Sequence, residues 1–148
     1  MPLKTHPYHK IKDGPVAASD VDDTIFMWNV PEDYEGPLVT VDFNGYKEIG
    51  IPNTPMIEFI KKFKRRGHSI LVWSRAGSDW AEAVVNAVGL TDYVDVILPK
   101  LTHFFDDVRD PADKLGNWTY IDPDGFAYHM NGGSVVKRHL SEKKGDIK

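Results

Sequence analysis

Short apolar segments alternate with helical segments over the first two thirds of the chain, and this alternation limits most strongly what the chain can fold into. The segments at 15–19, 68–74 and 93–100 have the length and apolar content of buried strands. Helical patterns occupy 53–67 and 79–89 between them. Strands that alternate with helices are typical of an α/β protein. We therefore expect a three-layer, Rossmann-like sandwich with a mostly parallel central sheet.

The rest of the chain is assigned to the same sheet. "THFF" at 102–105 and "NWTYI" at 117–121 are predicted as a fourth and a fifth strand, and the tail at 134–144 has a weak helical pattern. A length of 148 residues suits one hydrophobic core. We expect one domain over residues 1–148.

A hairpin is predicted after the first strand. Asn44-Gly45 lies between two apolar runs, and Asn-Gly favours a type I′ turn. In that register Asp42 lies opposite Lys47, a favourable cross-strand pair. We expect a small flap over about residues 28–52, too short for a separate cap domain.

Polar side chains follow four of the predicted strands. They are Asp20 and Asp22, Ser74, Lys100, and the pair Asp106 and Asp107. Because ligands bind at the carboxyl ends of parallel strands, we expect these side chains to converge on one edge of the sheet.

The chemistry of this set points to a phosphoryl group. In an extended segment Asp20 and Asp22 point to the same side. Hard oxygen ligands without His or Cys suit Mg²⁺, which would relieve the repulsion between the carboxylates. A cation, an ammonium and a hydroxyl together can hold phosphate oxygens, while one carboxylate attacks phosphorus and a second transfers a proton. Hydrolysis of a phosphomonoester needs these parts.

The same residues resemble the haloacid dehalogenase (HAD) superfamily. "SDVDDTI" is similar to its first motif, DxDxT, and Ser74 at the end of "ILVWS" to the Ser or Thr of the second. Lys100 is similar to the basic residue of the third motif, and "FFDD" to the fourth. The four motifs occur in family order over residues 16–107.

The resemblance implies catalytic roles. Asp20 would be the nucleophile that forms an aspartyl-phosphate, and Asp22 the general acid and base. Ser74 and Lys100 would hold the phosphoryl group. Family members with an acid at the position of Asp22 are phosphatases rather than dehalogenases.

Metal and substrate contacts follow from the resemblance too. Mg²⁺ would be bound by Asp20, the main-chain carbonyl of Asp22, and Asp106. Asp107 would act through water, with Asp110 as the other candidate for the second acid of the fourth motif. Two further substrate-binding candidates have structural alternatives, a main-chain contact for Thr24 and a surface ion pair for Arg75.

Composition limits the partners and the cellular compartment that we expect for this chain. The net charge of −4 does not favour nucleic acid as a partner except as a substrate. No apolar run is long enough to span a membrane, and no secretory signal precedes the first strand. The absence of cysteine excludes thiolate chemistry and suits the cytoplasm.

The expected substrate is a small-molecule or nucleotide phosphomonoester, and the sequence leaves its identity and the oligomeric state open. Two other functions stay open. One is a HAD-type protein that binds a phospho-ligand without strong catalysis, and the other is a receiver-like domain that accepts a phosphoryl group. Receivers place the phosphorylated Asp on a later strand than the acidic pair, whereas here both features coincide on the first strand.

Overall fold

The computed structural model describes residues 8–111, 115–131 and 134–141. Within these residues it contains two α-helices, one short 3-10 helix and nine strands. In chain order the elements are β1 (Val16–Ser19), β2 (Phe26–Met27), β3 (Val39–Phe43), β4 (Tyr46–Pro52), α1 (Thr54–Arg65), β5 (Ser69–Ser74), α2 (Ser78–Ala87), η1 (Thr91–Tyr93), β6 (Val96–Pro99), β7 (Trp118–Ile121), β8 (Phe126–Asn131) and β9 (Ser134–His139).

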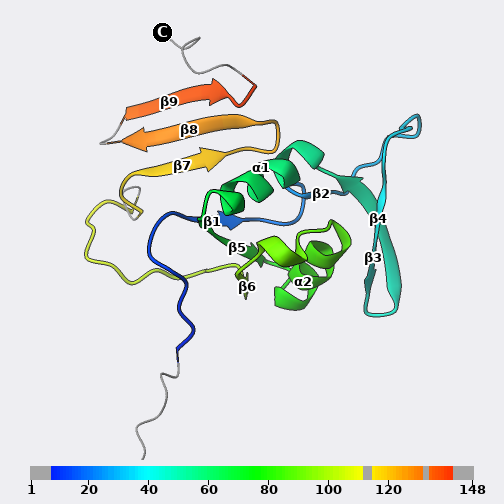
Figure 1. Cartoon of the computed structure of the whole chain (residues 1–148), viewed down its shortest axis with the longest axis horizontal. Helices are drawn as coiled ribbons and strands as arrows, with labels where there is room; N and C mark the ends of the chain where they lie inside the picture. Colours follow the sequence, from blue (N-terminus) through cyan, green and yellow to red (C-terminus); the bar gives the residue numbers. More distant parts are fainter. Residues whose placement is uncertain (1–7, 112–114, 132–133, 142–148) are drawn as a thin grey trace, which may run out of the picture.

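The strands form three small sheets instead of one central sheet (Figure 1). One is parallel, in the order β1-β5-β6. The others are antiparallel, in the orders β2-β4-β3 and β7-β8-β9. The predicted three-layer, Rossmann-like sandwich with a mostly parallel central sheet is therefore wrong.

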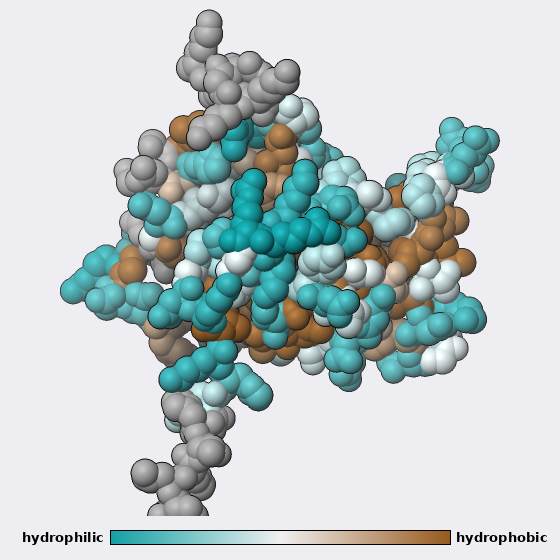
Figure 2. Space-filling model, viewed as in Figure 1, coloured by the Kyte–Doolittle hydropathy of each residue, from teal (hydrophilic) through white to brown (hydrophobic). Residues whose placement is uncertain are grey.

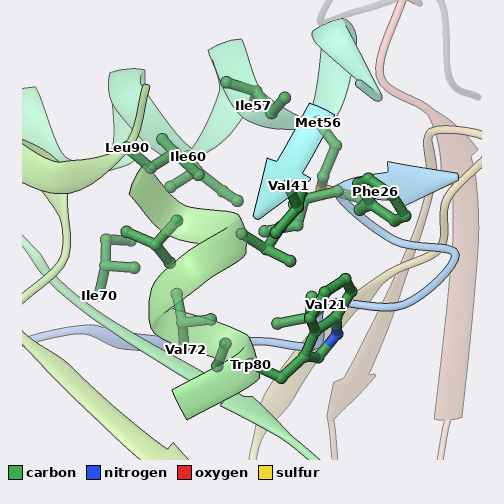
Figure 3. Packing of buried hydrophobic residues seen from close by; sticks show 14 residues of the cluster. Val21, Phe26, Val41, Met56, Ile57, Ile60, Ile70, Val72, Trp80 and Leu90 are labelled. Carbon is green, nitrogen blue, oxygen red and sulfur yellow. The ribbon is translucent and has the colours of Figure 1, made fainter. Parts of the chain in front are cut away.

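The parallel sheet has helices on only one face. The chain passes from β1 to β5 to β6 in one direction across the sheet, and right-handed connections then place both helices on the same side. Ile70 and Val72 of β5 are buried on that side with residues of α1 and α2, including Ile60 and Trp80 (Figure 3). A third layer needs a helix on the opposite face, and none of the described segments supplies one.

The segment after β6 departs most from the prediction. Residues 102–105 form no strand and are exposed, so the parallel sheet ends at β6. The predicted fifth strand forms as β7, but it pairs antiparallel with β8. A tight turn can join antiparallel neighbours, whereas a parallel pairing needs a crossover of about a dozen residues or more. The weak helical pattern predicted at 134–144 is wrong for residues 134–139, which are strand β9, and residues 142–144 lie outside the described residues.

Asp122 explains why the local pairing of β7 and β8 forms. Its Oδ1 accepts hydrogen bonds from the main-chain N–H of Asp124 (3.0 Å) and of Phe126 (2.9 Å). A side chain that bonds its own turn in this way stabilises the turn. The turn at 122–125 therefore directs the chain back along β7.

The loop after β1 is anchored by apolar side chains. Val21, Ile25 and Phe26 are all fully buried, although Val21 stands between two acidic residues. The carbonyl of Val21 accepts hydrogen bonds from the N–H groups of Ile25 (3.0 Å) and Phe26 (3.2 Å). Burial of each such side chain contributes about 1.5–3 kcal/mol. The acidic residues are thus held on a compact, well-packed loop.

The predicted hairpin is confirmed as β3 and β4. Asn44 (φ 52°) and Gly45 (φ 80°) are both left-handed, as a type I′ turn requires, and Lys47 Nζ lies 2.8 Å from Asp42 Oδ1. Figure 2 shows hydrophobic side chains on the surface over this hairpin, at the right of the view. Strand β2 pairs with β4 and joins the hairpin to the acidic loop.

Candidate functional site

The carboxyl ends of the three parallel strands bring together four residues from three parts of the sequence. Asp20 and Asp22 follow β1, Ser74 ends β5, and Lys100 follows β6. The main-chain N–H of Lys100 donates to the carbonyl of Ser74 over 3.0 Å, which fixes the ends of β5 and β6 beside each other. The predicted convergence of these four side chains is therefore present.

Lys100 faces Asp20. Its Nζ lies 3.9 Å from Asp20 Oδ1, and the two side chains are 32% and 37% exposed. At this distance and exposure the pair adds little to stability. The ammonium places a positive charge beside the Asp20 carboxylate, and both groups are partly open to solvent.

Ser74 is fully buried, and its hydroxyl already has partners. Ser74 Oγ donates to Asp22 Oδ2 over 3.3 Å and accepts from the N–H of Ala76 over 3.0 Å. In this arrangement the hydroxyl orients Asp22 and the start of the next loop. This hydroxyl can donate to a phosphoryl group only if its hydrogen bond to Asp22 is broken.

Two tryptophans hold the other oxygen of Asp22. Trp28 Nε1 donates to Asp22 Oδ1 over 2.8 Å, and Trp80 Nε1 donates to the same atom over 3.0 Å. The two indole rings are stacked, with their centroids 5.5 Å apart and their planes at 20°. Neither tryptophan is among the site residues predicted from the sequence. For Trp80, the available signal was its place in the first turn of the helix that follows Ser74, since a buried indole N–H needs an acceptor.

The remaining predicted site residues do not take part in the contacts between Lys100 and Asp20 or between Ser74 and Asp22. Asp106 and Asp107 are on the exposed segment after β6, and Asp106 Oδ1 accepts from the N–H of Val108 over 3.1 Å. Asp110 lies on the same exposed segment, and Arg75 is exposed just after β5. Thr24 is half-buried, and its carbonyl accepts from Asn53 Nδ2 over 2.8 Å. The acids of "FFDD" are not brought to Asp20 because residues 102–105 do not join the sheet.

The donors for Mg²⁺ are partly assembled. Asp20 and Asp22 supply hard oxygen atoms at one place, the chemistry that Mg²⁺ prefers. In the described part of the chain, no three His, Cys, Asp or Glu side chains are grouped so that they could hold a metal ion. Two of the four predicted ligands therefore fit, and Asp106 and Asp107 do not contribute from their present positions.

A pocket of about 360 Å³ opens beside Asp22. It lies between the hairpin and the start of α2, and its lining consists of Asp22, Trp28, Phe43, Glu48, Ala76 and Trp80. This volume is at the lower end of the range of small-molecule sites, about 300–1,000 Å³. The pocket is continuous with the candidate site because Asp22 belongs to both.

Comparison with known proteins identifies no relative: no family model, no curated protein and no solved structure matches the chain. Within residues 8–111, 115–131 and 134–141, no helix is both long and apolar enough to cross a membrane.

Proposed function

We propose that this protein hydrolyses phosphomonoesters through an aspartyl-phosphate on Asp20, as phosphatases of the HAD superfamily do. One observation carries the proposal. Asp20 and Asp22, Ser74, and Lys100 come from three separate segments, yet Lys100 Nζ lies 3.9 Å from Asp20 Oδ1 and Ser74 Oγ lies 3.3 Å from Asp22 Oδ2. The proposal depends on this site and not on the fold, since one chemistry recurs on unrelated folds.

In the first step a carboxylate oxygen of Asp20 attacks the phosphorus atom. The bond between phosphorus and the ester oxygen breaks, and Asp22, in its protonated form, donates a proton to that leaving oxygen. Lys100 balances charge on the phosphoryl oxygens from its place beside Asp20. The products of this step are the free alcohol and the aspartyl-phosphate.

In the second step water attacks the phosphorus atom of the aspartyl-phosphate. Asp22 accepts a proton from that water, the bond between phosphorus and Asp20 breaks, and inorganic phosphate leaves. The indole N–H groups of Trp28 and Trp80 orient the Asp22 carboxylate in both steps. Mg²⁺ bound by Asp20 and the main-chain carbonyl of Asp22 would neutralise phosphoryl oxygens.

The proposed substrate is a small-molecule or nucleotide phosphomonoester, and nucleic acid enters only as a substrate. The cytoplasm is the proposed compartment, in keeping with a chain that has no cysteine.

A second candidate is a protein that binds a phospho-ligand without turning it over. The separation of Asp106 and Asp107 from Asp20 favours it, because a site with fewer acids holds a metal ion less tightly. A ligand anion would then bind beside Lys100, and Asp20 would not be phosphorylated.

The test is hydrolysis of an aryl phosphate by the purified chain, with Mg²⁺ and with EDTA. Asp20→Asn is nearly isosteric and should abolish hydrolysis. Asp92→Asn is the matched control, since Asp92 is exposed in η1. Intact mass after rapid quenching should show one phosphoryl group on the wild-type chain and on Asp92→Asn, but none on Asp20→Asn.

The outcomes separate the two candidates. Hydrolysis that requires both Mg²⁺ and Asp20 supports the phosphatase. Hydrolysis that survives Asp20→Asn overturns the assignment of the nucleophile. Binding of inorganic phosphate that depends on Lys100, without hydrolysis of any ester, supports the binding protein.

A further inference from the structure

Half of the residues that line the pocket beside Asp22 are aromatic. Trp28 and Trp80 line one part of it, and Phe43 of the hairpin meets the ring of Trp80 edge-on, with centroids 5.3 Å apart. Trp80 is 4% exposed, whereas Trp28 is 41% exposed. An exposed indole beside a cavity offers a face on which a flat ring can stack.

Glu48 and Asp22 are the two acidic side chains that line the pocket. Glu48 lies on β4 and is half-buried. Its carboxylate forms no hydrogen bond or ion pair with any residue that the structure describes. A half-buried carboxylate without a partner favours a ligand that brings a hydrogen-bond donor.

We propose that this pocket binds the leaving group of the substrate, and that this group contains an aromatic ring with an amino or N–H donor that faces Glu48. A nucleobase is the natural source of such a ring. The inference rests on the proposed function, because Asp22 connects the pocket to the phosphoryl site.

The alternatives fit the lining less well. A sugar ring carries several hydroxyl groups, and apart from Asp22 the pocket offers only one side-chain carboxylate to satisfy them. An acyclic leaving group would leave Phe43 and Trp28 uncovered. A flat ring with one donor matches both the walls and the single acceptor.

The experiment compares adenosine 5′-monophosphate with ribose 5-phosphate, which lacks the base. For the wild-type chain we expect kcat/KM at least about tenfold higher with the base, since stacking of one base on an aromatic side chain commonly contributes a factor of this order. Phe43→Leu and Glu48→Ala should each lower this ratio about tenfold. Phe43→Leu keeps an apolar side chain, so the hairpin keeps its packing.

Tyr46→Leu is the matched control. Tyr46 lies opposite Phe43 in the hairpin, is 72% exposed, and does not line the pocket. The ratio should not change in this variant. Phenyl phosphate and 4-aminophenyl phosphate form a second pair of substrates. A preference for 4-aminophenyl phosphate over phenyl phosphate, without a preference for the nucleotide over ribose 5-phosphate, would identify a simple aryl group as the ring.

Binding of adenosine, which carries no phosphate, tests the pocket apart from catalysis. Adenosine should quench tryptophan fluorescence, and Phe43→Leu should weaken its binding about tenfold. If neither phosphate ester is hydrolysed but adenosine still binds in this way, the proposed function fails and the ring site stands. Equal kcat/KM for the two esters, together with no binding of adenosine, overturns the ring site and leaves the phosphatase in place.

Discussion

The indole N–H of Trp80 donates to Asp22 Oδ1 over 3.0 Å. Trp80 belongs to α2, whereas Asp22 follows β1, so a helix fixes the orientation of a carboxylate on a distant loop. Trp80 is almost fully buried, and its ring is held by Phe26, Trp28 and Phe43. The acid of the candidate site is therefore positioned by the hydrophobic core itself.

Replacement of Trp80 by another aromatic residue should remove the hydrogen bond to Asp22 while the packing of the core is kept. Trp80→Phe keeps an aromatic ring and removes the N–H. We expect kcat for an aryl phosphate to fall about tenfold with KM little changed, which corresponds to the loss of about one hydrogen bond to a charged group. Trp118→Phe on β7 is the matched control. A loss of stability with unchanged kcat would mean that the bond serves only the fold.

Removal of the Ser74 hydroxyl should destabilise the chain. Ser74→Ala removes the hydrogen bonds of this hydroxyl to Asp22 and from the N–H of Ala76, at a cost of about 0.5–1.5 kcal/mol for each bond. Urea unfolding measures this cost. Ser69→Ala is the control, because Ser69 is also buried on β5 but its hydroxyl forms no hydrogen bond with the described residues. Equal effects of the two substitutions would contradict the assigned role.

Gly50 should not tolerate a side chain. A Cβ at this position would lie 2.7 Å from the carbonyl oxygen of Met27 and would overlap the ring of Phe26, which is fully buried. Because a main-chain atom cannot easily move aside, Gly50→Ala should lower the free energy of unfolding by about 1–3 kcal/mol. Denaturant titration checks this. An unchanged midpoint would show that β2 and β4 can separate without cost.

Asp95 should make the stability depend on pH in the acid range. Burial acts to raise the pKa of Asp95, but two hydrogen bonds to its carboxylate outweigh burial. Lys64 Nζ (2.6 Å) and the N–H of Ile70 (2.8 Å) both donate to the carboxylate, so the pKa of Asp95 lies below its ordinary value of 3.8. A lowered pKa in the folded state means that the stabilisation is complete above pH 3.8 and is lost as the pH falls through the folded-state value.

Unfolding free energies measured between neutral pH and pH 3 test this sign. The wild-type chain should lose stability toward acid, and Asp95→Asn should lose less of it over the same range. Asp92→Asn, at an exposed position, should behave as the wild type does. A steeper acid loss in Asp95→Asn would refute the assignment.

Local chemistry accounts for the parts of the fold that the sequence predicted well. The hairpin depends on two residues, Asn44 and Gly45, whose left-handed conformation requires no distant contact. Strands β1, β5 and β6 are short apolar runs, and the helices between them set their parallel order. The same local pattern placed Asp20, Ser74 and Lys100 at one edge.

The wrong predictions concern segments that could pair with strands of more than one sheet. The residues of β7 have the pattern of a strand in either sheet, and the turn at Asp122 selects the antiparallel neighbour. Without a further parallel strand, Asp106 and Asp107 stay on an exposed segment. The hydrophobic periodicity of a segment predicts a strand but does not indicate which of two sheets that strand will join.

By itself, the sequence determined the strands β1, β5 and β6 with the helices between them, the hairpin turn, and the polar residues that end these strands, because each of these follows from a few neighbouring side chains. Tertiary structure alone decided that the sheet stops at three strands, that Trp28 and Trp80 share one oxygen of Asp22, and that Phe43 and Glu48 enclose a pocket beside it. These features depend on packing between distant segments, and the free energy of such packing is not encoded in any one stretch of the chain.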